Sequence, residues 1–168
     1  AGVEWDSAGF ISNAKLWKNG TKTHIAGSSI ANADANDVFV NGSDVYVAFD
    51  VSNLGTGLRS ARLWKNGTVT VLSNDSTHFY ANCVYVAGND VYVGGQRYLS
   101  SITYRAVIWK NGVAQYLSSA QTHSQVNKIL VVGNDVYAVG QDNLAGNGTG
   151  RAVIWKNGQP TYLTDGIN

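Results

Sequence analysis

Several residue types are almost missing from this chain of 168 residues. There is no methionine, and cysteine, proline and glutamate occur once each, as Cys83, Pro160 and Glu4. A single cysteine excludes a disulfide within one chain, and its position aligns with Asp37 and Lys128, which favours a passive small residue over a nucleophile. The lack of methionine, even at the first position, fits a processed or excised segment.

Charge and long apolar runs are also scarce. Only 14% of the residues are charged and the formal net charge is +1, so neither nucleic acid nor an anionic membrane surface is expected as a partner. No apolar stretch approaches 18 residues, so no membrane insertion is expected. Recurring paired carboxylates, a Gly-x-Ser-x-Gly elbow and a Gly-Lys-Ser/Thr phosphate loop are absent. We therefore expect no enzymatic activity, no cofactor and no metal site.

What the chain has instead is a tetrapeptide, Trp-Lys-Asn-Gly, that occurs four times. The copies follow one another at intervals of 47, 45 and 46 residues and lie at Trp17–Gly20, Trp64–Gly67, Trp109–Gly112 and Trp155–Gly158. A period of this length is typical of stacked repeats or propeller blades. Asn-Gly tolerates the two positive φ angles of a type I′ turn, and β-type residues flank each copy. Each copy therefore predicts a β-hairpin.

Three of the four copies carry a second predicted hairpin before the first. Its turns are Gly-Ser-Asp at 42–44 and Gly-Asn-Asp at 88–90 and 133–135. A full unit is thus four antiparallel strands. In the first copy Val3–Asp6 aligns with Val47–Asp50, so the chain opens in a second strand and the innermost strand is missing. The tally is fifteen strands, and Pro160 predicts that the last one lies at an edge.

Four-stranded units of about 45 residues are typical of propeller blades, and the nearly continuous apolar strands fit sheets that are covered on both faces. We expect an all-β fold: a β-propeller of about four four-stranded antiparallel blades, with the first blade lacking its innermost strand. A β-sandwich or a β-solenoid is the alternative. The chain is expected to form a single domain, 1–168, with copies at about 1–29, 30–75, 76–120 and 121–168.

A missing strand leaves apolar blade faces without cover. One buried tryptophan of roughly 200 Å² contributes on the order of 5 kcal/mol at about 25 cal/mol/Å², so two exposed faces favour closure or association. The chain could close on itself, or be part of a longer propeller, or join a second copy head to tail into an eight-bladed ring. We expect a self-associating half-propeller, a homo-oligomer that completes a larger ring.

Two sets of polar residues recur in register with the repeat. Asn32, His78 and His123 precede the innermost strands, near one mouth of the expected channel, and are the candidate ligand-binding residues. The second set, with the four repeated tryptophans, is expected to be structural between blades, since recurring polar side chains usually satisfy backbone groups. These structural residues are Asn36, Asn82, Asn127, Trp17, Trp64, Trp109 and Trp155.

The Trp-Lys-Asn-Gly hairpin, together with Gly-Asn-Asp-Val-Tyr-Val, resembles a group of bacterial propeller-repeat proteins. Most of these are secreted or displayed at the cell surface and have no assigned activity. The resemblance covers nearly the whole chain and implies the fold and a secreted or cell-surface location, but it carries over no catalytic residue. The Gly-His and Trp-Asp pairs of Trp-Asp repeats are absent.

The leading functional hypothesis is a non-enzymatic binding or assembly scaffold that associates with itself. Loops around the channel would contact a protein or glycan ligand. A carbohydrate-binding, lectin-like propeller is the alternative, with Tyr80, Tyr98 and Tyr104 stacking on sugars. A third possibility is an engineered or excised propeller fragment with no ligand.

Overall fold

The computed structural model describes residues 1–73, 77–100, 103–119, 122–144 and 150–166. They form two compact units, Ala1–Ala81 and Asn82–Asn168, with the boundary inside strand β8 (Phe79–Ala87). The described residues contain fifteen β-strands and no helix, which confirms the all-β class and the predicted strand tally.

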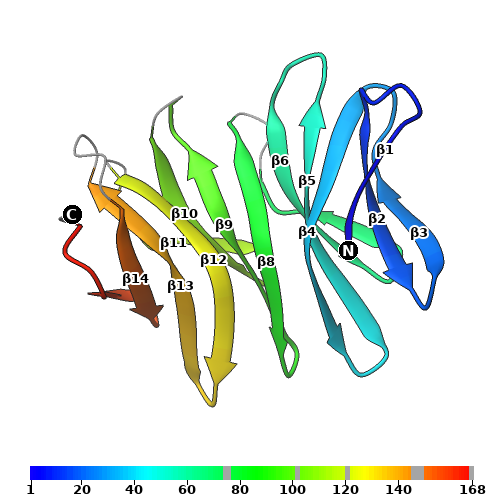
Figure 1. Cartoon of the computed structure of the whole chain (residues 1–168). Helices are drawn as coiled ribbons and strands as arrows, with labels where there is room; N and C mark the ends of the chain where they lie inside the picture. The colour runs from blue at the N-terminus through cyan, green and yellow to red at the C-terminus, as the bar shows by residue number, and fades with distance from the viewer. Residues whose placement is uncertain (74–76, 101–102, 120–121, 145–149, 167–168) are drawn as a thin grey trace. The chain divides into compact units, whose positions relative to one another are not determined.

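The first unit contains two antiparallel sheets (Figure 1). The three-stranded sheet has the order β1 (Gly2–Trp5), β2 (Ser12–Lys18), β3 (Thr21–Ala26). The four-stranded sheet has the order β4 (Ala31–Asn41), β5 (Asp44–Asn53), β6 (Arg59–Lys65), β7 (Thr68–Val71). In each sheet the strands follow chain order, because every connection within a sheet is a short hairpin or loop.

The second unit is built from two sets of four strands. The first set is β8, β9 (Asp90–Tyr98), β10 (Tyr104–Lys110) and β11 (Val113–Tyr116). The second is β12 (Thr122–Val132), β13 (Asp135–Leu144), β14 (Arg151–Lys156) and β15 (Gln159–Tyr162). Among the described pairs, one parallel pair, Tyr104 with His123, joins the two sets. Strand β15 lies at an edge, as Pro160 predicted.

The Trp-Lys-Asn-Gly segments form the predicted type I′ turns. The asparagine has φ of 50° at Asn19, 46° at Asn66, 51° at Asn111 and 51° at Asn157, and the following glycine is also in the left-handed region. The other hairpins turn through Gly42, Gly88 and Gly133, whose φ angles lie between 58° and 60°. A positive φ at the first central position alone is typical of a type II′ turn.

The two turn types are tied together by the same contacts in each four-stranded set. In β5 and β6, Asn66 Nδ2 donates to Asp44 Oδ1 at 2.7 Å and Asn66 Oδ1 accepts from the Val45 N–H at 2.9 Å. Lys65 Nζ lies 2.8 Å from Asp44 Oδ2. The same arrangement recurs at Asp90, Lys110 and Asn111, and at Asp135, Lys156 and Asn157. These groups are exposed, so they orient the turns more than they stabilise the fold.

Each sheet has two faces, which we name after repeated residues. The tryptophan face carries Trp17, Trp64, Trp109 or Trp155. The opposite leucine face carries the residue that follows the Asn-Gly hairpin at Ile25, Leu72, Leu117 or Leu163.

In the first unit the leucine face of β1–β3, with Ala14, Leu16 and Ile25, packs on Val47, Phe49 and Trp64 of the next sheet. In the second unit Tyr92, Ile108 and Leu117 pack on Ile129, Val153 and Trp155 in the same way. Within each unit, therefore, the leucine face of one set of strands packs on the tryptophan face of the next.

The alignment of Val3 with Val47 is wrong. Val3 pairs with Ala14 in β2, whereas Val47 pairs with Trp64 in β6, so β1 is offset by three residues. The short connection after β1 sets this register: Asp6 accepts backbone hydrogen bonds from Gly9 and, through its carboxylate, from Phe10. Turn geometry fixes the register of a hairpin. Val3 and Val47, which look equivalent in the sequence, therefore lie on opposite faces of their sheets.

Candidate functional site

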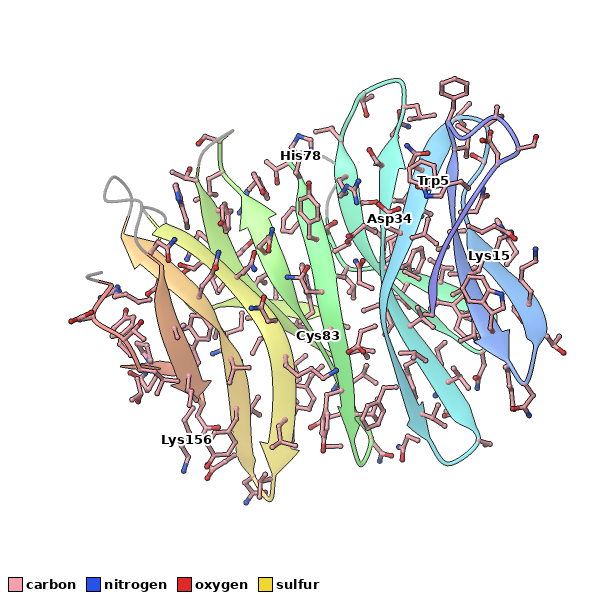
Figure 2. All side chains as sticks on the ribbon, in the orientation of Figure 1. Trp5, Lys15, Asp34, His78, Cys83 and Lys156 are labelled. Carbon is pink, nitrogen blue, oxygen red and sulfur yellow. The ribbon has the colours of Figure 1, made fainter. Side chains whose placement is uncertain are left out.

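The three predicted ligand-binding residues are divided between the two units. In the first unit, Asn32 Oδ1 accepts a hydrogen bond from the Ser12 N–H at 2.9 Å, which ties β4 to β2. His78 directly precedes β8 (Figure 2). In the second unit the ring of His123 stacks on Tyr104, with centroids 5.3 Å apart and planes inclined by 12°. Asn32 and His123 have local structural contacts, and a shared ligand site for the three stays a prediction.

Two of the three repeated asparagines join neighbouring strand sets within their own unit. Asn36 lies at the bulge of β4, and its Nδ2 donates to the Ala81 carbonyl at the start of β8, at 2.9 Å. Asn82 Nδ2 donates to the Val126 carbonyl in β12, also at 2.9 Å. Asn127 is exposed and accepts a hydrogen bond from Gln125 in its own strand.

Beside Asn36 lies a buried acid that the sequence analysis did not single out. The Asp50 carboxylate, 1% exposed, accepts from Asn36 at 2.9 Å and from the Ala81 N–H at 2.6 Å. Arg59 lies 3.8 Å away and is itself paired with Asp34 at 2.8 Å. Burial raises the pKa of Asp50 to about 7, although these donors and Arg59 act in the opposite direction. The sequence alone could have pointed to Asp50, because the equivalent positions 96 and 141 are both glutamine.

The four repeated tryptophans do not share one environment. Trp109 and Trp155 are 1% exposed and Trp64 is 8% exposed, whereas Trp17 is 44% exposed. Trp17 therefore departs from the expected burial between blades. The physical reason is its position: it lies on the outer tryptophan face of the first sheet, and only the leucine face of that sheet packs on β4–β7.

The outer tryptophan face of β1–β3 is partly polar. Glu4 accepts from Lys22 at 2.6 Å and lies 3.5 Å from Lys15. Lys15 Nζ is 2.9 Å from Nδ1 of His24 on the neighbouring strand. The hydrogen bond from Lys22 holds the pKa of Glu4 below its ordinary value. These contacts place a charged cluster on the same face as Trp17.

The leucine face of the last sheet carries several exposed apolar residues. Leu163 is 60% exposed, whereas the equivalent Ile25, Leu72 and Leu117 are 8%, 8% and 9% exposed. On the same face Val139 is 41% exposed, and its equivalents are the fully buried Ala48 and the buried Gly94. The apolar residues Leu130 and Val132 extend this surface along β12 at 50% and 58% exposure. Since large exposed apolar patches mark interaction sites, this face is the main candidate functional surface of the second unit.

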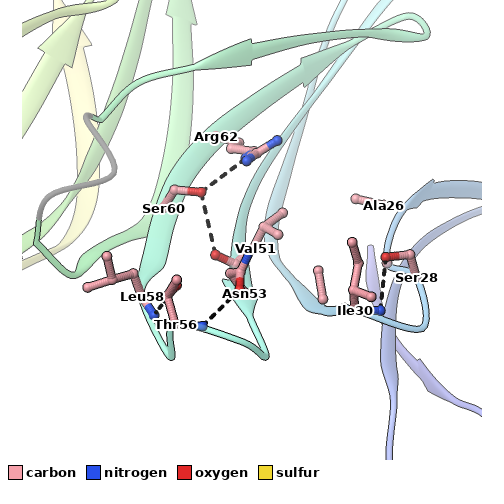
Figure 3. Close-up of a pocket in the computed structure, with 11 residues that line it drawn as sticks. Ala26, Ser28, Ile30, Val51, Asn53, Thr56, Leu58, Ser60 and Arg62 are labelled. Atoms are coloured by element: carbon pink, nitrogen blue, oxygen red, sulfur yellow. Dashed lines mark hydrogen bonds between the residues drawn. The ribbon is translucent and has the colours of Figure 1, made fainter.

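The first unit also contains a cleft of about 520 Å³. Figure 3 shows Ser60 and Arg62 of β6 on one wall, and Ala26 of β3 with Ser28 and Ile30 of the β3–β4 connection on the other. Arg62 Nε donates to Ser60 Oγ at 3.1 Å. Arg62 is the only charged residue among the described lining, and positions 107 and 153, its equivalents in the second unit, are buried valines. The charged side chain in the lining of this cleft is therefore a feature of the first unit.

The aromatic residues named for a lectin-like site contact other side chains. Tyr98 and Tyr104 stack with centroids 5.1 Å apart, and Tyr104 also stacks on His123. The guanidinium of Arg59 lies 5.0 Å from the centroid of the Tyr80 ring. Because sugar binding needs free ring faces, these contacts do not favour a carbohydrate site at the three tyrosines.

The described residues contain no cluster of three or more His, Cys, Asp or Glu side chains that could hold a metal ion. In the same part of the chain no helix is long and apolar enough to span a membrane. No protein-family model matches the sequence, and no curated protein matches it.

Proposed function

We propose that the chain is a β-propeller repeat module that serves as an assembly scaffold and associates head to tail with further copies of itself. The resemblance of its hairpin motifs to bacterial propeller-repeat proteins supports a secreted or cell-surface location. In the assembly, the leucine face of β12–β15 in one copy covers the tryptophan face of β1–β3 in another.

The observation that carries the proposal is the exposure of Leu163, 60% against 8–9% at its three equivalents. Within each unit, a leucine face of this kind is covered by the tryptophan face of the next sheet. Among the described residues, the last leucine face exposes Leu163 and the first tryptophan face exposes Trp17. Covering one with the other repeats a packing that the chain already uses.

The proposed interface is heterologous, since the two surfaces differ. A heterologous contact closes into a ring when the rotation between copies allows it and otherwise extends into an open chain. The cluster of Glu4, Lys15 and Lys22 makes the receiving face more polar than the faces inside each unit. We therefore expect moderate affinity, with dissociation at low protein concentration.

Sedimentation velocity of three single variants tests the proposal. We expect Leu163→Asp and Trp17→Asp each to lower the sedimentation coefficient to that of a monomer, since each places a charge in the interface. Val113→Asp is the matched control, because Val113 is 73% exposed on β11 and the change should leave association intact. Loss of association in Leu163→Asp but not in Trp17→Asp would mean that two leucine faces pair with each other, which contradicts the head-to-tail arrangement.

A further inference from the structure

The charged residue in the cleft of the first unit is out of place in the packing pattern of the repeat. Arg62 lies two residues before Trp64, so both side chains belong to the same face of β6. It is partly buried. Its equivalents in the second unit, Val107 and Val153, are 0% and 1% exposed. A valine therefore meets the packing needs of this position, and the guanidinium requires another explanation.

The guanidinium of Arg62 also lacks the kind of partner that the equivalent cation of the first sheet has. That cation is Lys15, and it lies 3.5 Å from the carboxylate of Glu4. Within the part of the chain that the structure describes, no carboxylate pairs with Arg62, whose side chain makes one hydrogen bond, from Nε to Ser60 Oγ. The terminal nitrogens Nη1 and Nη2 are thus left to donate to a group that enters the cleft.

Two further polar side chains of the lining have used their acceptor oxygens and retain donors. Asn53 Oδ1 accepts from the N–H groups of Gly55 and Thr56 at 2.9 and 3.0 Å, which leaves Nδ2 to donate. Ser28 Oγ accepts from the Ile30 N–H at 3.4 Å, which leaves its hydroxyl hydrogen. The described lining contains no carboxylate. One positive charge among donors favours a ligand group that only accepts, as a carboxylate does.

The remaining side chains of the lining are aliphatic. Ile30, Val51 and Leu58 supply the largest of them, and Ile30 is 69% exposed. Among the described lining residues there is no aromatic ring, so the cleft suits an aliphatic chain better than a stacked ring. Its volume of about 520 Å³ lies in the range of sites for small molecules. Figure 3 shows that these groups come from both walls.

We propose that this cleft binds a small aliphatic carboxylate. The carboxylate accepts hydrogen bonds from the Arg62 guanidinium, and the aliphatic chain lies along Ile30, Val51 and Leu58. Such bonds between arginine and a carboxylate are charge-assisted, and the planar guanidinium fixes the orientation of its partner. A ligand of about eight non-hydrogen atoms should bind with a dissociation constant on the order of 1 mM. The inference concerns the first unit alone and does not rest on the proposed self-association.

A titration with hexanoate, followed by heteronuclear proton–nitrogen NMR, tests the site. The protein is the Leu163→Asp variant of the full chain, whose leucine face is disrupted, so that failure of the self-association proposal does not affect the result. We expect saturable shifts of the Arg62 Nε–H signal and of the backbone N–H signals of Ile30 and Leu58. Hexanamide has the same chain without the charge, and acetate lacks the chain. Each should bind at least about tenfold more weakly than hexanoate.

Two variants on this background locate the site. Arg62→Val introduces the residue found at both equivalent positions of the second unit, so it should preserve the fold and weaken hexanoate binding at least about tenfold. Lys18→Val is the matched control: it also removes one positive charge, but Lys18 is exposed at the end of β2 and outside the lining, so binding should not change.

Three results would overturn the proposal. The first is an affinity for hexanamide or acetate equal to that for hexanoate. The second is an equal affinity of the Arg62→Val and Lys18→Val variants for hexanoate. The third is a set of saturable shifts confined to residues outside the cleft, which would place the bound hexanoate elsewhere.

Discussion

The side-chain amide of Asn36 lies 2.9 Å from Oδ2 of Asp50, and the same nitrogen lies 2.9 Å from the carbonyl oxygen of Ala81. In the second unit the equivalent amide of Asn82 donates to Gln96 Oε1 at 3.2 Å and to the carbonyl of Val126. The arrangement is therefore the same, but the first unit places an ionisable, buried group where the second has a neutral amide. This position should therefore make the first unit respond to pH, whereas its equivalent in the second unit should not.

We predict that the free energy of unfolding of the first unit decreases as the pH rises from about 4 to about 7. The pKa of Asp50 is about 7 in the folded chain and near its ordinary value of 3.8 in the unfolded chain. Between these values the folded state binds the proton that the unfolded state has released, so stability falls with pH. The total change is about 2–4 kcal/mol. Urea denaturation monitored at several pH values measures it.

Asp50→Asn provides the control for this prediction. It removes the titrating group. The decrease in the free energy of unfolding between pH 4 and 7 should therefore vanish, whatever the absolute stability of the variant. The exposed carboxylates of Asp44, Asp90 and Asp135 have lowered pKa values because lysine side chains donate to them, so their effect lies below about pH 4. A slope that persists in Asp50→Asn would show that another group causes it.

Asn36→Ala should destabilise the first unit by about 1–3 kcal/mol. The change removes the donor to Oδ2 of the buried Asp50 and to the carbonyl of Ala81, and the loss of a hydrogen bond to a buried polar group costs about this much. Asn127→Ala is the matched control, since Asn127 is exposed and contacts Gln125 of its own strand, and it should cost less than about 0.5 kcal/mol. Similar losses in the two variants would contradict a special role for Asn36.

Trp109→Ala should cost about 3–5 kcal/mol, because Trp109 is 1% exposed and its removal opens a large cavity. The same change at Trp17, which is 44% exposed, should cost less than half as much. Thermal and chemical denaturation of the two variants at low protein concentration compares them without any contribution from association. A loss below about 1 kcal/mol in Trp109→Ala would be inconsistent with its packing.

Gly112→Ala should destabilise the β10–β11 hairpin by about 1–2 kcal/mol. Gly112 has a φ of 83° and an added Cβ would meet no atom within 4 Å, so the cost comes from the left-handed backbone alone. Gly112→Asn should cost less, because asparagine tolerates this conformation better than alanine. Equal stabilities of the wild-type chain and Gly112→Ala, measured by chemical denaturation, would contradict the type I′ geometry.

The local structure was predictable because it depends on short segments. Asn-Gly and Gly-x-Asp dictate turns through their own backbone preferences, and the runs between them are rich in β-forming residues, so the strands follow. The edge position of Pro160 follows from its missing N–H. The register of β1 was not predictable from the repeat, because the carboxylate of Asp6 closes a connection that the other copies do not have.

The candidate surfaces could be predicted only in part. The tryptophan at position 17 is followed by the same Lys-Asn-Gly as those at 64, 109 and 155, but its exposure depends on whether another sheet lies against it. The buried acid at Asp50 was visible as a departure from glutamine at the equivalent positions. The cleft beside Arg62 could not be predicted. The sequence shows arginine at 62 and valine at the equivalent positions of the second unit, but only the packing of the two sheets shows that a cleft lies there.

The solution mass of the wild-type chain tests the central claim most directly. Sedimentation equilibrium from about 1 to 500 µM should show a mass that rises from that of the 17.9 kDa chain toward twice that value or more, because the leucine face around Leu163 becomes covered. A mass that stays at that of a single chain over the whole range would contradict the account.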